Sequence, residues 1–262
     1  MSSEPFRLLA ASETERGLLF SFEIPAGSRL FEGHFPGHPI LPGVAHLALA
    51  ERALGAPFMA VRSLRLRRPV APGDVLELSL KDPDEEAWVR FELRRNGEPV
   101  SSGAVRTTPS GEEVPAGEAP RSTSGFPAIE HLLPHTPPAR LLGGIAEASP
   151  EEIRAVAEIP PGHPLAVDGL VPAFLGIEAG AQAAAALEAL NRSPDAPGPR
   201  IGYLVGVREA RFSAAALPTG RPLLVAARFQ GGAPPLSIYE IAVGEPGRET
   251  VTGTISTYLA KS

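Results

Sequence analysis

The chain repeats one sequence plan in its two halves. The string Phe22-Glu-Ile-Pro-Ala-Gly27 returns as Ala157-Glu-Ile-Pro-Pro-Gly162, and a helix-forming run follows each copy. Beyond each helix comes a similar strand sequence, Val61-Arg-Ser-Leu-Arg-Leu66 in the first half and Val207-Arg-Glu-Ala-Arg-Phe212 in the second. Self-similarity of this kind predicts two structural units of the same fold in one chain.

Each half reads as several strands, one apolar helix and then a meander of longer strands. The expected helices cover residues 44 to 54 and 173 to 190, and alternating apolar residues follow each of them. Asn96-Gly97 between two such segments is a hairpin signal. The order predicts an α+β fold in which each half is an antiparallel sheet wrapped around a central helix.

A linker separates the halves. Residues 109 to 125 have no apolar periodicity and are rich in Pro, Gly, Ser and Glu. We therefore expect an N-terminal domain over residues 1 to 108 and a C-terminal domain over residues 126 to 262.

Composition narrows the class of protein. The formal charge of −6 argues against a general nucleic-acid-binding role, and the absence of cysteine excludes disulfides and thiolate sites. The N-terminus lacks an apolar signal core, and no apolar run is long enough to span a bilayer. The expectation is a cytoplasmic protein without a membrane partner.

Residues 31 to 43 carry the strongest functional signal. His34 lies in a loop stiffened by Pro36, Pro39 and Pro42, so its imidazole should be held in one place. Gly43 falls at the N-terminus of the first helix, where exposed amides could polarise a carbonyl oxygen.

This loop resembles the signature of the bacterial beta-hydroxyacyl-[acyl-carrier-protein] dehydratases, which have the hotdog fold. The matching residues are His34-Phe-Pro-Gly-His-Pro-Ile-Leu-Pro-Gly43. In the second half, Leu132-Leu-Pro-His135, Glu178-Ala-Gly-Ala-Gln182 and Ile201-Gly-Tyr-Leu-Val-Gly-Val207 resemble other segments of the same superfamily. The whole chain is similar to two dehydratase subunits of aryl-polyene synthesis joined together, which implies a double hotdog packed as a pseudo-dimer.

The resemblance implies one composite active site. In the family, a loop histidine and a helix carboxylate fourteen residues later meet across the interface between partner hotdogs. Here that position in the first half is Ala48, so the acid is missing, whereas its counterpart in the second half is Glu178. The second half has in turn lost the His-Phe-Pro-Gly element, and its His163 aligns with Ser28. We expect His34 to act as base and Glu178 as acid, directly or through water.

Further residues are expected to bind the substrate. Gln182, one helical turn beyond Glu178, should orient the acid or the hydroxyl, and Phe35 and Pro42 should line the site. The thioester carbonyl would be held by the amide of Gly43 or by that of Ala173, and the sequence leaves both open.

Other titratable residues have ordinary interpretations. Glu51 could replace the missing acid, but beside Arg52 near a helix end we expect it to be solvated, and His46 should be structural. His131 and His135 have helical metal-ligand spacing, yet Pro134 interrupts the helix and no third ligand is evident, so no metal is expected.

Arginines gather on the strand after the first helix. Leu64 and Leu66 should face inwards, which leaves Arg65 and Arg67 pointing outwards. They form either a solvated sheet edge or a docking surface for an acidic acyl carrier protein.

The predicted function is a lyase that dehydrates 3-hydroxyacyl thioesters on a carrier protein or coenzyme A to trans-2-enoyl thioesters, without metal or redox cofactor. Two alternatives remain open. Hotdogs also host thioesterases, and the missing acid at Ala48 allows a catalytically inactive acyl-binding partner subunit. Two such chains could also pair as a homodimer.

Overall fold

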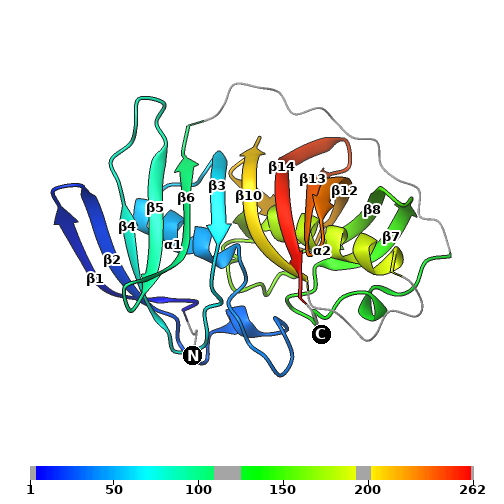
Figure 1. Cartoon of the computed structure of the whole chain (residues 1–262), viewed down its shortest axis with the longest axis horizontal. Coiled ribbons are helices and arrows are strands. Elements are labelled where there is room, and N and C mark those ends of the chain that lie inside the picture. The colour runs from blue at the N-terminus through cyan, green and yellow to red at the C-terminus, as the bar shows by residue number, and fades with distance from the viewer. Residues whose placement is uncertain (1–3, 109–124, 193–201, 261–262) are drawn as a thin grey trace.

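The computed structural model describes residues 4–108, 125–192 and 202–260. In this part of the chain, twelve strands form one antiparallel sheet in the order β1-β2-β4-β5-β6-β3-β10-β14-β13-β12-β8-β7 (Figure 1). The predicted linker lies outside the described residues except for Gly125.

The first half contributes six strands and α1 (Ala45–Leu54). Its strands are β1 (Arg7–Thr14), β2 (Gly17–Glu23), β3 (Ala60–Leu66), β4 (Val75–Leu80), β5 (Val89–Arg95) and β6 (Glu98–Arg106), and a short 3-10 turn, η1 (Arg29–Phe31), precedes the His34 loop. The hairpin between β5 and β6 is confirmed, because Asn96 and Gly97 both have positive φ, 52° and 80°. A tight hairpin turn of this hand requires that geometry.

The second half repeats the plan around α2 (Leu175–Leu190). Its strands in the large sheet are β7 (Leu142–Ala148), β8 (Glu152–Glu158), β10 (Gly202–Phe212), β12 (Pro222–Ala233), β13 (Leu236–Glu245) and β14 (Arg248–Leu259). A 3-10 turn, η2 (Ile129–His131), precedes β7, and β9 (Leu170–Pro172) pairs with β11 (Ala216–Pro218) in a separate two-stranded sheet.

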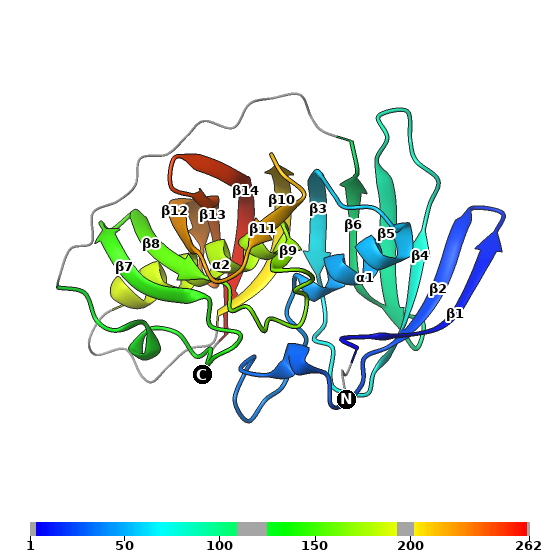
Figure 2. The ribbon, with the colours of Figure 1, turned by 180° about the vertical axis from the view of Figure 1, so that it is seen from behind.

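Both helices lie on the same side of the sheet, which curves around them (Figures 1 and 2). The helix α1 ends at Gly55, which adopts the left-handed conformation that commonly terminates helices. In α2, close packing uses small residues, since a Cβ on Gly180 would lie within 3 Å of three atoms of Ile241. The alanine-rich helix is therefore buried on nearly every side, as its composition predicted.

The two halves join edge to edge. Strand β3 of the first half pairs with β10 of the second, with Leu64 opposite Val207 and Arg65 opposite Gly206. The two predicted sheets are thus the halves of one continuous sheet. This pairing satisfies backbone groups that two open edges would leave exposed, and it fixes the loop before α1 relative to α2.

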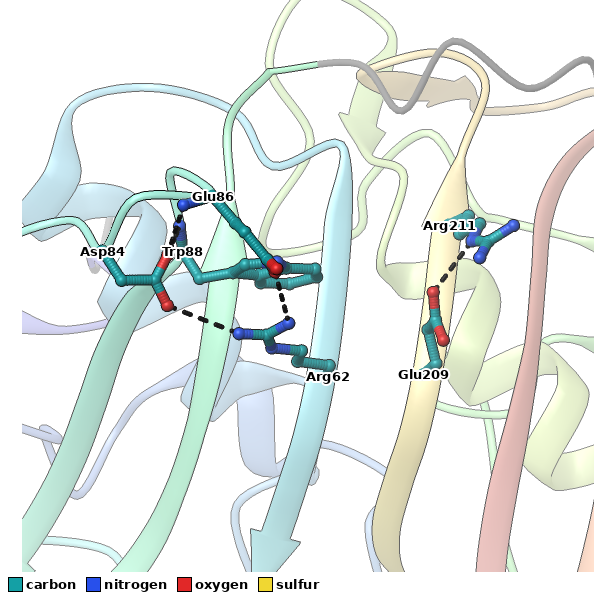
Figure 3. A network of polar contacts seen from close by, with 6 residues as sticks. All are labelled: Arg62, Asp84, Glu86, Trp88, Glu209 and Arg211. Carbon is teal, nitrogen blue, oxygen red and sulfur yellow. Dashed lines mark hydrogen bonds and ion pairs between the residues drawn. The ribbon is translucent and has the colours of Figure 1, made fainter.

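An arginine network lies beside this seam (Figure 3). The Arg62 guanidinium stacks 4.1 Å from the centroid of the Trp88 ring and contacts Asp84 and Glu86 at 3.4 and 3.2 Å. Glu209, which is opposite Arg62 in the ladder, accepts a hydrogen bond from Arg211 at 2.8 Å. These charges belong to the outer surface of the sheet.

No helix in the described part of the chain is long and apolar enough to cross a bilayer.

Candidate active site

The proline-rich loop holds His34 in a fixed orientation. The ring is 7% exposed, and its Nδ1 lies 3.0 Å from the carbonyl oxygen of Ile40, whose own N–H donates back to the His34 carbonyl at 3.0 Å. Because a carbonyl oxygen can only accept, Nδ1 carries the hydrogen. The Nε2 lone pair is therefore available to take a proton.

Glu178 lies in the first turn of α2 and is also 7% exposed. The Gln182 side-chain amide donates to its Oε1 at 3.1 Å, across one helical turn. Gln182 also donates to the carbonyl of Ala139 at 2.8 Å and accepts from the backbone N–H of Leu141 at 2.9 Å. It thereby ties the carboxyl group to the segment that leads into β7.

The structure brings His34 and Glu178 together from opposite halves of the chain, along with His135. A ring nitrogen from each histidine and a carboxylate oxygen of Glu178 all lie within 4.8 Å of one another. The His34 and His135 ring centroids are 5.2 Å apart, and Phe35 stacks on His34 at 4.4 Å. The cluster is buried, so its charges interact more strongly than they would in water.

The sequence analysis missed His135 as a site residue. Its Nε2 lies 3.6 Å from Glu178 Oε1, and its Nδ1 has no hydrogen-bond partner among the described residues. Burial lowers the pKa of His135 to about 4, against the opposing effect of Glu178, so the ring is neutral at pH 7. One sequence signal could have identified His135 as a site residue: it lies in a proline-rich segment, before Pro137 and Pro138, just as His34 lies in a proline-rich loop.

A cavity of about 360 Å³ opens onto this cluster. Its lining includes Phe35, Gly43 and Gln182 together with the three clustered residues. The backbone N–H of Gly43 has no acceptor among the described residues, whereas that of Ala173 donates to the Ala215 carbonyl at 2.9 Å. Of the two residues expected to supply the carbonyl-binding amide, only Gly43 both lines this cavity and has a backbone N–H without an acceptor among the described residues.

A second, smaller cavity shares His34 and Glu178 with the first. Its volume is about 30 Å³, enough for one water molecule. Pro42 and His163 are part of its lining. His163 therefore lies near Glu178 but outside the cluster of His34, His135 and Glu178, and burial lowers its pKa to about 4.

The remaining histidines and Glu51 lie outside the cluster of His34, His135 and Glu178. His46 is buried with its Nδ1 2.9 Å from Ser101 Oγ, although part of its surface borders the large cavity, and His131 is exposed. The expectation that Glu51 is solvated is wrong: it is half-buried, and burial raises its pKa to about 7. It is half-buried because it packs at the end of α1, near the Phe58 backbone, and it lines neither cavity.

Arg65 and Arg67 are exposed, in line with the alternation of β3. Arg67 borders the large cavity together with Arg68, and its guanidinium donates to Ser102 Oγ at 2.9 Å. Arg65 lies further along the outer surface.

Two family models divide the chain as the repeat does. The model described as ApeI dehydratase matches residues 10–104, and that described as ApeP dehydratase matches residues 127–262, which is more than half of the chain. The chain belongs to the ApeP-like dehydratase family. This ApeP-like protein carries its ApeI-like part in the same polypeptide, and the predicted family resemblance is confirmed.

Curated relatives of this ApeP-like dehydratase share part of its length. The 3-hydroxyacyl-[acyl-carrier-protein] dehydratase FabZ of Roseiflexus castenholzii is 38% identical over 101 residues, which is 34% of this chain and 63% of that protein. The FabZ of Thermus thermophilus is 42% identical over 97 residues, which is 32% of this chain and 61% of that protein. The chain thus spans about six tenths of the length of these relatives.

Solved structures extend the likeness to the whole fold. The dehydratase domain of RzxB from Pseudomonas fluorescens superposes with a TM-score of 0.71 over 95% of this chain and 97% of that one, at 18% identity. The likeness over the full length confirms the predicted double hotdog for this ApeP-like dehydratase.

Proposed function

We propose that the chain dehydrates 3-hydroxyacyl thioesters to trans-2-enoyl thioesters in fatty acid or polyene biosynthesis, at one composite site. The observation that carries this proposal is the meeting of His34 and Glu178 in one buried cavity, from opposite halves of the chain. Family membership supports the same chemistry.

His34 acts as the base. Its Nε2 takes the proton from C2 of the acyl group, and the charge that develops on the thioester oxygen accepts a hydrogen bond from the Gly43 amide. The contact between Nδ1 and Ile40 supports this role, because it stabilises the imidazolium that forms.

Glu178 acts as the acid. It donates a proton to the C3 hydroxyl as the C3–O bond breaks and the C2–C3 double bond forms, so that one water leaves. Its Oε1 is occupied by Gln182 and faces His135, which leaves Oε2 as the oxygen that carries the proton. The small cavity beside the pair has the size of the departing water. Transfer of the proton from His34 back to Glu178 completes the cycle, and no metal or redox cofactor takes part in these steps.

The substrate is carried on the phosphopantetheine arm of an acyl carrier protein or of coenzyme A. Arg67 at the rim of the cavity and Arg65 beyond it offer positive charge to an acidic carrier. Arg65→Ala together with Arg67→Ala should raise KM for the carrier-bound substrate and leave that for the coenzyme A thioester nearly unchanged.

The decisive experiment compares matched variants on a 3-hydroxyacyl carrier substrate. Glu178→Gln and His34→Ala should each reduce dehydration at least about 100-fold. Glu51→Gln on α1 and His131→Ala on the surface are the matched controls and should retain activity, and we also expect His163→Ala to retain it. Release of free carrier thiol without unsaturated product would indicate a thioesterase instead. Inactivity of the pure wild-type protein that a second subunit relieves would indicate a partner subunit.

A further inference from the structure

The catalytic cluster also contains the donor set of a metal site. Two imidazoles and one carboxylate are the protein ligands of catalytic zinc sites that keep a fourth position open. Here they are His34, His135 and Glu178, all at least 93% buried, with their ligand atoms within 4.8 Å of one another. The proposed dehydration steps give His135 no reacting role. With His34 and Glu178 it completes the set of three possible metal ligands.

The surroundings of the cluster match those of metal ligands. Metal-binding histidines usually donate their other ring N–H to a backbone carbonyl, and ligating carboxylates are themselves hydrogen-bonded. His34 Nδ1 faces the Ile40 carbonyl at 3.0 Å, and Gln182 donates to Glu178 at 3.1 Å. His135 Nδ1 has no hydrogen-bond partner among the described residues, and His135 Nε2 faces Glu178 Oε1 at 3.6 Å, on the side where an ion would lie.

The distances allow an ion after a small adjustment. Ligand atoms around tetrahedral zinc, with bonds of about 2.0–2.1 Å, lie roughly 3.3 Å apart. His135 Nε2 and Glu178 Oε1 are already 3.6 Å apart, so the main change is an approach of His34. The large cavity borders all three residues and leaves the fourth position for water.

We infer that this triad binds one Zn²⁺ ion and that the bound ion inhibits dehydration. Imidazole suits zinc, and the carboxylate supplies a negative charge within the buried cluster. The ion would occupy the lone pair with which His34 takes the C2 proton, and it would bind the Glu178 carboxyl group that otherwise faces the substrate hydroxyl. Inhibition therefore rests on the proposed function, whereas binding does not.

Calorimetric titration of ZnCl₂ into untagged, chelator-stripped protein at pH 7.5 tests binding without any assay of activity. We expect one Zn²⁺ per chain. His135→Phe and Glu178→Gln should each weaken binding at least about 100-fold, while His163→Phe, the matched control at a neighbouring half-buried histidine, should bind as the wild type does. Circular dichroism establishes that each variant is folded. Cobalt absorption bands provide a second readout that loss of the triad should abolish.

Equal zinc binding by the wild type and the His135→Phe variant, or none by the folded wild type, would overturn the inference. In an activity assay, Zn²⁺ should compete with the thioester and a chelator should restore the rate. Full activity with zinc bound in the triad would also overturn it. Zinc binding that depends on the triad, in a protein without dehydratase activity, would instead refute the proposed function and leave the metal site standing.

Discussion

Gln182 holds Glu178 from one helical turn away, with a 3.1 Å hydrogen bond to Oε1. The same oxygen lies 3.6 Å from His135 Nε2. Two neighbours on one side of the carboxyl group make its two oxygens unequal, and the proposed mechanism assigns the proton to the other oxygen, Oε2. The orientation of the acid thus depends on residues that do not themselves react.

Gln182→Met should lower kcat about 100-fold, because the carboxyl group loses its orientation. The change also leaves the buried Leu141 N–H unpaired, which costs about 1–3 kcal/mol of unfolding free energy, and it removes the bond to the half-buried Ala139 carbonyl. Steady-state kinetics and urea unfolding at pH 7.5 measure the two effects. Unchanged kcat in a destabilised variant would show that Gln182 has only a structural role.

Gly43→Ala should raise KM for the thioester about tenfold, the usual effect of one extra carbon in a substrate pocket. A Cβ at this position would lie 2.5 Å from Leu66 Cδ1, and the flexible leucine would move into the cavity. Gly27→Ala is the matched control, since nothing lies within 4 Å of the added carbon. Wild-type KM in the Gly43 variant would contradict the placement of the carbonyl group beside this amide.

His46→Gln should reduce the loss of stability in acid. Burial lowers the pKa of His46 from 6.5 to about 4, so the unfolded chain binds a proton before the folded one does. The contribution of His46 is complete above pH 6.5 and is lost as pH falls towards 4, by about 3 kcal/mol in total. Urea unfolding should show that the variant loses less unfolding free energy between pH 7.5 and pH 4.5 than the wild type does. An equal loss in both proteins would rule out protonation of His46 as a cause.

Glu51→Gln should change how the stability of the fold depends on pH near neutrality, whereas His46→Gln changes it in acid. Burial raises the pKa of Glu51 from 4.5 to about 7, so the folded protein keeps the proton longer than the unfolded chain. Its stabilising effect is complete below pH 4.5 and is lost as pH rises through 7. Compared with wild type, the variant should gain stability between pH 5 and pH 8, as melting temperatures across that range would reveal. Melting temperatures that change with pH in the same way in the variant and in the wild type would argue against this effect of Glu51.

The sequence predicted the features that depend on local pattern and on the repeat. The loop of His34, the helix of Glu178 and the Asn96-Gly97 hairpin could all be read from residue order. The pairing of His34 with Glu178 followed from the family resemblance together with what each half lacks, and the structure places both side chains at one cavity.

Features that depend on tertiary packing escaped the sequence analysis. His135 joins the site because the segment that follows it is held against α2 by the hydrogen bonds of Gln182 with Ala139 and Leu141. From sequence, His131 and His135 have helical metal-ligand spacing, but Pro134 interrupts the helix, so neither residue is assigned to a site; in the structure His131 is exposed. The environment of Glu51 likewise depends on a chain segment that follows the helix, and the free state of the Gly43 amide depends on loop geometry.

The two halves that pair through β3 and β10 belong to a single polypeptide. Their ratio is then one to one at any expression level, and dilution cannot separate them. Every folded chain therefore brings its one His34 and its one Glu178 together, although the first half has Ala48 and the second half has the shortened loop.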